Sequence, residues 1–204
     1  METIFFVAIL IMSVVIHEVS HGYMASFLGD PTAKLAGRLT LNPIPHIDPV
    51  GSIILPLILS LIPGGIIFGW AKPVPFNPYN LKAGKWGPAL VAIAGPVSNL
   101  ILAVFFGLII RQADWLGLSP AVVSISGMIV LINVILMIFN LIPVPPLDGS
   151  KIFFALLPYR FRRIENMLQN NQFIVIIAVL LFAGVIIEPV VSALFWVLTG
   201  LSIA

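Results

Sequence analysis

Long apolar stretches separated by short polar ones dominate the hydrophobic pattern of this 204-residue chain. Residues 4–28, 88–110 and 120–141 are each apolar over about the 20 residues that a helix needs to cross the hydrocarbon core of a bilayer. Residues 50–68 and 172–204 are also apolar, but prolines interrupt both stretches. The pattern therefore predicts a polytopic membrane protein rather than a globular soluble domain.

The interrupted stretches decide how many helices cross. Within residues 50–68, Pro56 and the turn signal Pro63-Gly64-Gly65 favour a segment that enters the membrane and returns on the same side. Residues 172–204 are too long for one untilted span, and Glu188-Pro189 divides them, which predicts two short or tilted helices.

The expected fold is an all-α polytopic membrane protein with about five to six transmembrane helices and one re-entrant segment. A short mixed stretch at Thr32–Leu41 can form a small membrane-associated β-hairpin or sheet. We expect a single domain over residues 1–204, with a core at 4–157 and a C-terminal helical pair at 172–204.

Composition supports this fold and removes several functions. Apolar residues make up 60% of the chain and charged residues 9%, against about 25% charged residues in an ordinary soluble domain. The net charge of +2 comes from basic residues scattered along the chain, so no basic stripe for nucleic acid is expected. The absence of cysteine excludes disulfides, thiolate metal sites and a cysteine nucleophile.

The basic residues also predict how the chain sits in the membrane. If residues 50–68 cross, seven of the ten lysines and arginines fall on one side. If this stretch is re-entrant, Lys34 and Arg38 join them and the majority becomes nine. Basic loops prefer the cytosol. The re-entrant arrangement is therefore favoured, with the N-terminus outside and the later half of the first apolar stretch nearer the cytosolic face.

An H-E-x-x-H motif lies in the first apolar stretch, from His17 through Glu18 to His21. In a helix these histidines are one turn apart on one face, so both imidazoles can bind the same zinc ion. In proteases with this motif, the glutamate is the base that takes a proton from the attacking water. Ionisable groups inside a span are destabilising unless they are paired or bound to a metal, which favours a functional motif over a chance one.

A catalytic zinc ion usually has a third protein ligand. Asp148 follows the apolar stretch 120–141 in a proline-broken segment, where a cation would stabilise its carboxylate. Asp148 can meet the histidines only if the two helices run in the same direction. The residues alone leave an equal alternative, an ordinary helix cap or turn before Lys151, because Asp148-Gly149 is also a common turn dipeptide.

Three motifs in order resemble the site-2 protease family of intramembrane zinc metalloproteases, and the stretches Asn42–Gly51 and Phe68–Pro78 resemble its compact prokaryotic branch, which lacks PDZ and CBS domains. The three motifs are His17–His21, the run Gly95-Pro96-Val97-Ser98-Asn99, and residues 140–149, which read N-x-x-P-x-x-x-x-D-G. The resemblance implies that His17, His21 and Asp148 hold Zn²⁺ and that Glu18 is the catalytic base. It also implies a prokaryotic cell-membrane enzyme whose substrates are membrane-spanning proteins, cut within or near the bilayer.

Other polar residues have two interpretations each. Asn140 can donate to the developing oxyanion or satisfy carbonyls that the following prolines free. Asn99 is interpreted as packing helices together rather than as part of the chemistry. His46 with Asp48 is interpreted as a loop brace rather than a second metal site or proton relay, and Glu188 as a solvated turn residue.

The alternative function is a metal-binding membrane protein or metal transporter without proteolytic activity. A transporter places ionisable residues along a path through several helices, whereas this chain concentrates them at one place. We therefore predict a zinc metalloendopeptidase that sits in a lipid bilayer and binds no nucleic acid; its oligomeric state is left open. An edge strand near residues 33–41 or 70–76 could hold an extended substrate, and a plain connecting loop is the alternative for either stretch.

Overall fold

The computed structural model describes residues 2–61, 69–158 and 161–202. The chain is 77% helical, and no strand occurs among these residues. Three helices are long and apolar enough to span a bilayer: α1 (Glu2–Phe27), α4 (Gly87–Arg111) and α6 (Pro120–Leu141). A fourth candidate is the pair formed by α8 (Arg162–Asn170) and the start of α9 (Gln172–Thr199), bent by 79°. The described chain thus has three to four candidate spans where five to six were predicted.

The remaining helices are short and lie between the long ones. They are α2 (Thr32–Leu35), two 3-10 turns at Ile44–His46 and Pro78–Asn80, a π turn at Pro49–Ile54, α3 (Leu55–Ser60), a 3-10 turn at Gly84–Trp86, α5 (Ala113–Leu116) and α7 (Asp148–Leu156). The β-hairpin predicted at Thr32–Leu41 does not form. Asp30 accepts hydrogen bonds from the backbone N–H and the hydroxyl of Thr32, and the turn that these bonds fix leads directly into α2.

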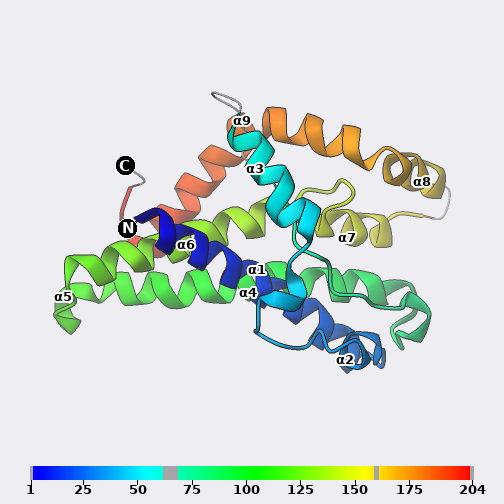
Figure 1. The fold of residues 1–204 in the computed structure, drawn as a ribbon, viewed down its shortest axis with the longest axis horizontal. Coiled ribbons are helices and arrows are strands. Elements are labelled where there is room, and N and C mark those ends of the chain that lie inside the picture. Colours follow the sequence, from blue (N-terminus) through cyan, green and yellow to red (C-terminus); the bar gives the residue numbers. More distant parts are fainter. Residues whose placement is uncertain (1, 62–68, 159–160, 203–204) are drawn as a thin grey trace.

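The long helices alternate in direction. Figure 1 shows α1 and α6 running the same way, as the placing of His17 and Asp148 required, with α4 running in the opposite direction. Helix α4 packs against both. The end of α1 and the loop before α4 meet where the Lys82 N–H donates to the Leu28 carbonyl at 2.9 Å. The chain between α1 and α4 therefore returns to the end of the bundle that it left. Residues 62–68, in the predicted re-entrant segment, lie outside the described residues.

Helix α9 replaces the helical pair predicted for the C-terminal stretch. It is one helix with Pro189 inside it, and its ribbon changes direction near the middle in Figure 1. Membrane helices tolerate an internal proline because neighbouring groups satisfy the freed backbone. Glu188 consequently lies within the helix, with an exposed side chain, and not in a turn.

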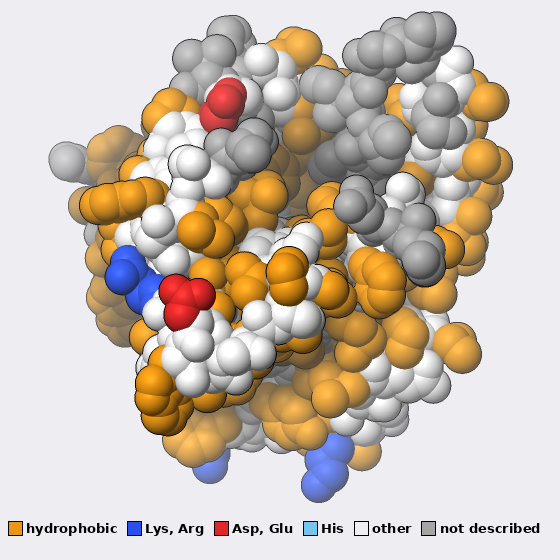
Figure 2. All heavy atoms as spheres, turned by 90° about the vertical axis from the view of Figure 1, so that its left-hand side faces the viewer, with side chains coloured by type: hydrophobic (Ala, Val, Ile, Leu, Met, Phe, Trp, Pro, Cys, Tyr) orange, Lys and Arg blue, Asp and Glu red, His pale blue; other side chains and the backbone are white. Residues whose placement is uncertain are grey.

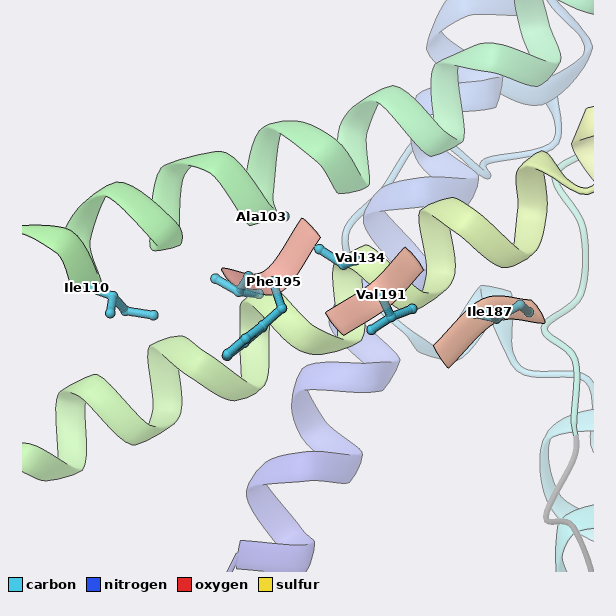
Figure 3. Packing of buried hydrophobic residues seen from close by; sticks show 7 residues of the cluster. Ala103, Ile110, Val134, Ile187, Val191 and Phe195 are labelled. Atoms are coloured by element: carbon cyan, nitrogen blue, oxygen red, sulfur yellow. The ribbon is translucent and has the colours of Figure 1, made fainter. Parts of the chain in front are cut away.

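The main apolar core lies between α4, α6 and α9 (Figure 3). It consists of Ala103, Ile110, Val130, Val134, Ile187, Val191 and Phe195. A second cluster of Ala25, Leu81 and Val91 holds the loop before α4 against α1 and α4. These two clusters fix the long helices around the polar site described below.

Large apolar side chains also cover much of the outside. Phe105 on α4 is 58% exposed and Leu181 on α9 is 69% exposed. The face drawn in Figure 2 is mostly apolar, with charged side chains in only a few places. Such a surface suits contact with lipid rather than with water.

Candidate metal centre

Three side chains from distant parts of the chain meet at one point. His17 and His21 project from α1, and Asp148 is the first residue of α7. The Nε2 atoms of His17 and His21 lie 3.0 Å apart. Asp148 Oδ2 is 3.1 Å from the first of these nitrogens and 3.0 Å from the second. All three residues are buried.

The outer nitrogens of both histidines are held by oxygen atoms. His21 Nδ1 lies 2.7 Å from the Val91 carbonyl oxygen, and His17 Nδ1 lies 2.6 Å from Asn99 Oδ1. A carbonyl oxygen can only accept, so each Nδ1 carries the proton and donates it. In the neutral rings, each Nε2 is then left with a lone pair that points at the other ring and at Asp148. Three acceptor atoms facing one another call for a cation between them.

The donor set fits zinc in both chemistry and size. Zinc binds imidazole nitrogen and carboxylate oxygen at about 2.0–2.2 Å, and in a tetrahedral arrangement these ligands stand about 3.3 Å apart. The separations of 3.0–3.1 Å between His17, His21 and Asp148 are close to that spacing. Across the described residues, this is the group of His, Asp and Glu side chains placed to hold a metal.

Gly95 on α4 leaves the space that this arrangement needs. A Cβ atom at this position would lie 2.5 Å from His17 Cε1 and 2.5 Å from His21 Nε2. The glycine of the motif in α4 is therefore required by close approach to both imidazoles.

Asp148 is held in place by helix α7 and by a cation. It lies in the first turn of α7, where the helix dipole favours a negative charge, and Lys151 Nζ binds its Oδ1 at 3.1 Å. The Lys151 ammonium favours the ionised form of the Asp148 carboxylate. A Cβ on Gly149 would collide with the Leu141 backbone. Asp-Gly therefore begins a closely packed helix and is not a solvated turn.

Glu18 lines the same cavity, which has a volume of about 640 Å³. Its side chain is half-buried, and its Oε2 accepts a hydrogen bond of 2.8 Å from the Val74 backbone N–H. Most of the other residues that line this cavity are apolar.

The stretch Trp70–Val74 forms one wall of this cavity. Every second N–H in it is bonded to the body of the protein: Trp70 to the Gly51 carbonyl, Lys72 to the His46 carbonyl and Val74 to Glu18. Such alternation is typical of an extended chain with one fixed edge. The stretch is not assigned as a strand, so the predicted edge strand is an extended wall segment.

The two asparagines singled out from the sequence bind different groups. Asn99 does not merely pack helices, because its Oδ1 binds His17 directly. Asn140 lines the cavity, and its Nδ2 donates to the Leu136 carbonyl at 2.9 Å. An amide NH₂ group has two N–H bonds, so this contact leaves Asn140 with donor capacity. Its role in the chemistry stays a prediction.

His46 and Asp48 brace the loop, as interpreted from the sequence. His46 is buried, with Nε2 3.0 Å from the Thr40 carbonyl oxygen. Asp48 accepts hydrogen bonds from the N–H groups of Val50 and Gly51. Both side chains thus bind local backbone.

Sequence reasoning missed the second layer of the site. Asn133 on α6 accepts a hydrogen bond from Asn99 and donates one to Ser13 on α1. The available signal was a lone amide inside an apolar span, where a polar side chain needs a partner. Nothing in the sequence indicated which partner.

Comparisons with known proteins agree with this site. The model for peptidase family M50 matches residues 117–184. YwhC of Bacillus subtilis (strain 168), named as a candidate zinc metalloprotease, is 39% identical over 198 residues, covering 94% of this chain and 84% of the relative. Rip2 of Mycolicibacterium smegmatis, with a name of the same form, is 35% identical over 142 residues, which cover 68% of this chain and 52% of that relative. The chain thus matches about half of the Rip2 length. No solved structure gives a significant match.

Proposed function

Because this chain belongs to peptidase family M50, we propose that it is an intramembrane zinc metalloprotease that hydrolyses peptide bonds of membrane-spanning proteins within or near the bilayer. The single observation that carries this proposal is the convergence of two imidazole nitrogens and one carboxylate oxygen, 3.0–3.1 Å apart, in a buried site. Sequence similarity to YwhC and Rip2 supports the same activity.

In this proposal His17, His21 and Asp148 are the zinc ligands. A bound zinc ion would polarise the scissile carbonyl and lower the pKa of the attacking water. The protein groups fix the ring orientation: the Val91 carbonyl holds His21, and Asn99 holds His17. Both nitrogens therefore face the metal position before any ion binds.

Glu18 is the proposed base. It lines the cavity next to the ligand atoms, so it can take a proton from water and pass it to the leaving nitrogen of the substrate. Its present bond to the Val74 N–H occupies one lone pair of Oε2. A carboxylate has further lone pairs on its two oxygens, so Glu18 can keep this bond while it accepts a proton.

The wall segment Trp70–Val74 is the proposed place for an extended substrate. A substrate helix hides its carbonyls in internal hydrogen bonds, so it must unwind before it is cut. The other edge of the wall segment, that of Ala71 and Pro73, makes no backbone hydrogen bond with the described residues, and proline supplies a carbonyl but no N–H. We expect the substrate to contribute the donors in this pairing. Asn140 on the same cavity is a further candidate to hold substrate or oxyanion.

The placing in the membrane is also proposed here. The chain between α1 and α4 returns to the end of the bundle that it left (Figure 1), which supports a re-entrant stretch at residues 50–68 and an active site nearer the cytosolic face. Single cysteines introduced at Lys34 and Lys82 should then react with an impermeant thiol reagent from the same side of sealed vesicles. Labelling from opposite sides would contradict this topology.

The test of the function is Glu18→Gln in the full chain, purified and reconstituted into liposomes with a membrane-spanning substrate. Glu18 is not a proposed ligand, so zinc content should stay at the wild-type level. Cleavage should fall by about 10²–10⁴-fold, the usual contribution of a general base. The matched control is Glu188→Gln, because Glu188 is exposed on α9, and this variant should cut normally.

The same experiment separates the alternative function. A metal transporter would move zinc across the liposome membrane without cutting the substrate. Wild type and Glu18→Gln would then both show no cleavage. Undiminished cleavage by Glu18→Gln, or zinc transport without cleavage by the wild type, would refute the proposal. The buried, single-locus site favours the protease.

A further inference from the structure

We propose that Asn133 on α6 is a positioning residue for the metal site: through Asn99 it decides which nitrogen of His17 carries the proton. This inference rests on the proposed function, because it assumes that His17 is a zinc ligand. Asn133 has no place in the three motifs, lies 116 positions along the chain from His17, and has no contact with the proposed metal position among the described contacts.

The orientation of the Asn133 amide is fixed by a backbone carbonyl oxygen. The Ile129 carbonyl oxygen can only accept, and it lies 2.8 Å from the amide nitrogen of Asn133. If the Asn133 amide were turned over, two oxygen atoms would face each other there. The orientation of this amide is thus set by a backbone atom of α6.

The orientation is passed on one residue at a time. With its nitrogen on Ile129, Asn133 presents Oδ1 to Asn99, whose Nδ2 donates to it at 2.8 Å. Asn99 must then present its own Oδ1 to His17, and this contact is 2.6 Å. His17 can satisfy that oxygen only with an N–H, so Nδ1 carries the proton and Nε2 keeps its lone pair for the metal.

Burial makes this chain of bonds difficult to replace. Asn99 and Asn133 are both 0% exposed, and Ser13, the second acceptor for Asn133, is 3% exposed. Water therefore does not take over a lost hydrogen bond, and a buried polar group left without its partner is destabilised. Loss of Asn133 would leave Asn99 free to turn its amide over and present N–H groups to His17.

The two histidines differ in this respect. His21 is held by the Val91 carbonyl, a backbone oxygen with a fixed role. His17 is held by a side-chain amide that can present either end. Only His17 therefore needs a second residue to choose its proton position, and Asn133 is that residue.

The first test removes the hydrogen-bonding groups that orient the Asn99 amide. Asn133→Leu keeps a side chain of similar size but has neither donor nor acceptor. Zinc affinity should fall by about 10–100-fold, as for loss of other groups that orient ligands. Affinity is measured on the full chain in detergent, after removal of bound metal, by competition with a fluorescent zinc chelator. Ser13→Ala is the control: Asn133 keeps its bond to Ile129, so the affinity should change little.

The second test replaces the Asn99 amide with a group that accepts a hydrogen bond in either orientation. A carboxylate at position 99 has acceptors at both ends, so it can accept only from His17 Nδ1, whatever lies at position 133. The double variant Asn133→Leu with Asn99→Asp should therefore recover most of the zinc affinity that Asn133→Leu loses. A purely structural role for Asn133 predicts no such recovery, because the second substitution restores no packing.

The outcomes separate the two proposals. Unchanged zinc affinity in Asn133→Leu, or no recovery in the double variant, overturns the inference while the proposed function stands. Failure of the wild type to bind zinc overturns the proposed function itself. If Asn133→Leu does not fold, Asn133→Ala takes its place, alone and combined with Asn99→Asp: the single variant should bind zinc more weakly and the double variant should recover affinity, and any other result overturns the inference.

Discussion

Buried polar groups serve two different purposes in the helical core and in the chain between α1 and α4, residues 28–86, which we call the loop layer. In the core, Asn133 binds Asn99, and Asn99 in turn binds His17. In the loop layer, polar side chains such as Asp30 and Arg38 bind backbone groups. The first arrangement sets the direction of lone pairs, and the second sets the shape of the cavity wall.

This difference means that substitutions in the two regions should affect different measurements. Substitutions of the core residues that contact or orient the histidines should change zinc affinity. Loop-layer substitutions should change stability and leave zinc affinity intact, because α1 and α4 carry both histidines and both of their outer partners.

The largest effect is expected from Gly95→Ala in the core. The new methyl group would lie 2.5 Å from atoms of His17 and His21, and the rings cannot move away without breaking their outer hydrogen bonds. Zinc affinity should fall by more than the roughly 100-fold typical of lost orienting groups, measured by chelator competition. The matched control is Gly127→Ala on α6, where a Cβ meets nothing within 4 Å. Normal zinc binding by Gly95→Ala would contradict the close-approach argument.

The next effect is expected from Asp148→Asn. The substitution keeps the shape of the side chain but removes the negative charge that faces the two imidazoles. Zinc affinity should fall by at least the 10–100-fold typical of lost orienting groups, because a ligand itself is weakened, and the folded protein should remain, because Gly149 and the start of α7 are unchanged. Zinc content of the purified variant, with circular dichroism as the fold measurement, checks both statements. Full zinc occupancy would remove Asp148 from the ligand set.

A smaller effect of another kind is expected from Asp30→Asn in the loop layer. Asp30 is 0% exposed and accepts hydrogen bonds from Thr32, Asn77 and Asn80. Asp30→Asn turns one of the accepting oxygens into an NH₂ group, which cannot accept a hydrogen bond from these donors. The free energy of unfolding should therefore fall by about 1–3 kcal/mol. Thermal or denaturant unfolding in detergent measures the loss, and zinc affinity should not change. Asp114→Asn, at an exposed aspartate, is the control.

The smallest effect concerns pH. Burial raises the pKa of Asp30, but its hydrogen bonds lower it by more, so its pKa lies below the ordinary 3.8. The ionised carboxylate therefore stabilises the fold above pH 4, and this contribution is lost as the pH falls through the depressed pKa. The stability difference between wild type and Asp30→Asn should be constant from pH 5 to pH 7 and shrink at lower pH. If the stability difference between the two proteins stays the same at low pH, the charge of Asp30 is not what stabilises the fold.

The sequence predicted the parts of the site that are local. His17 and His21 follow from i, i+4 spacing within one helix, and the structure brings both to Asp148. Asp148 was ambiguous without the family resemblance, because Asp-Gly is read equally well as a turn. Asn133 could not be found, since its role depends on which helices face each other, and an isolated amide in an apolar span does not say that.

The fold was predicted where apolar length decides it and missed where local hydrogen bonds decide it. The three long helices lie where the apolar stretches predicted them. The hairpin at Thr32–Leu41 failed because Asp30 binds Thr32 and starts a helical turn. The C-terminal pair became one bent helix because Pro189 alone does not end a helix surrounded by apolar neighbours.

The contact between Glu18 and Val74 has a consequence for large-scale mutagenesis. Its donor is a main-chain amide, and nineteen of the twenty amino acids supply the same amide. A saturation scan at position 74 would therefore report on wall shape for every replacement except one. Val74→Pro alone deletes the amide, and comparing it with Val74→Ile would reveal whether the glutamate needs its backbone partner.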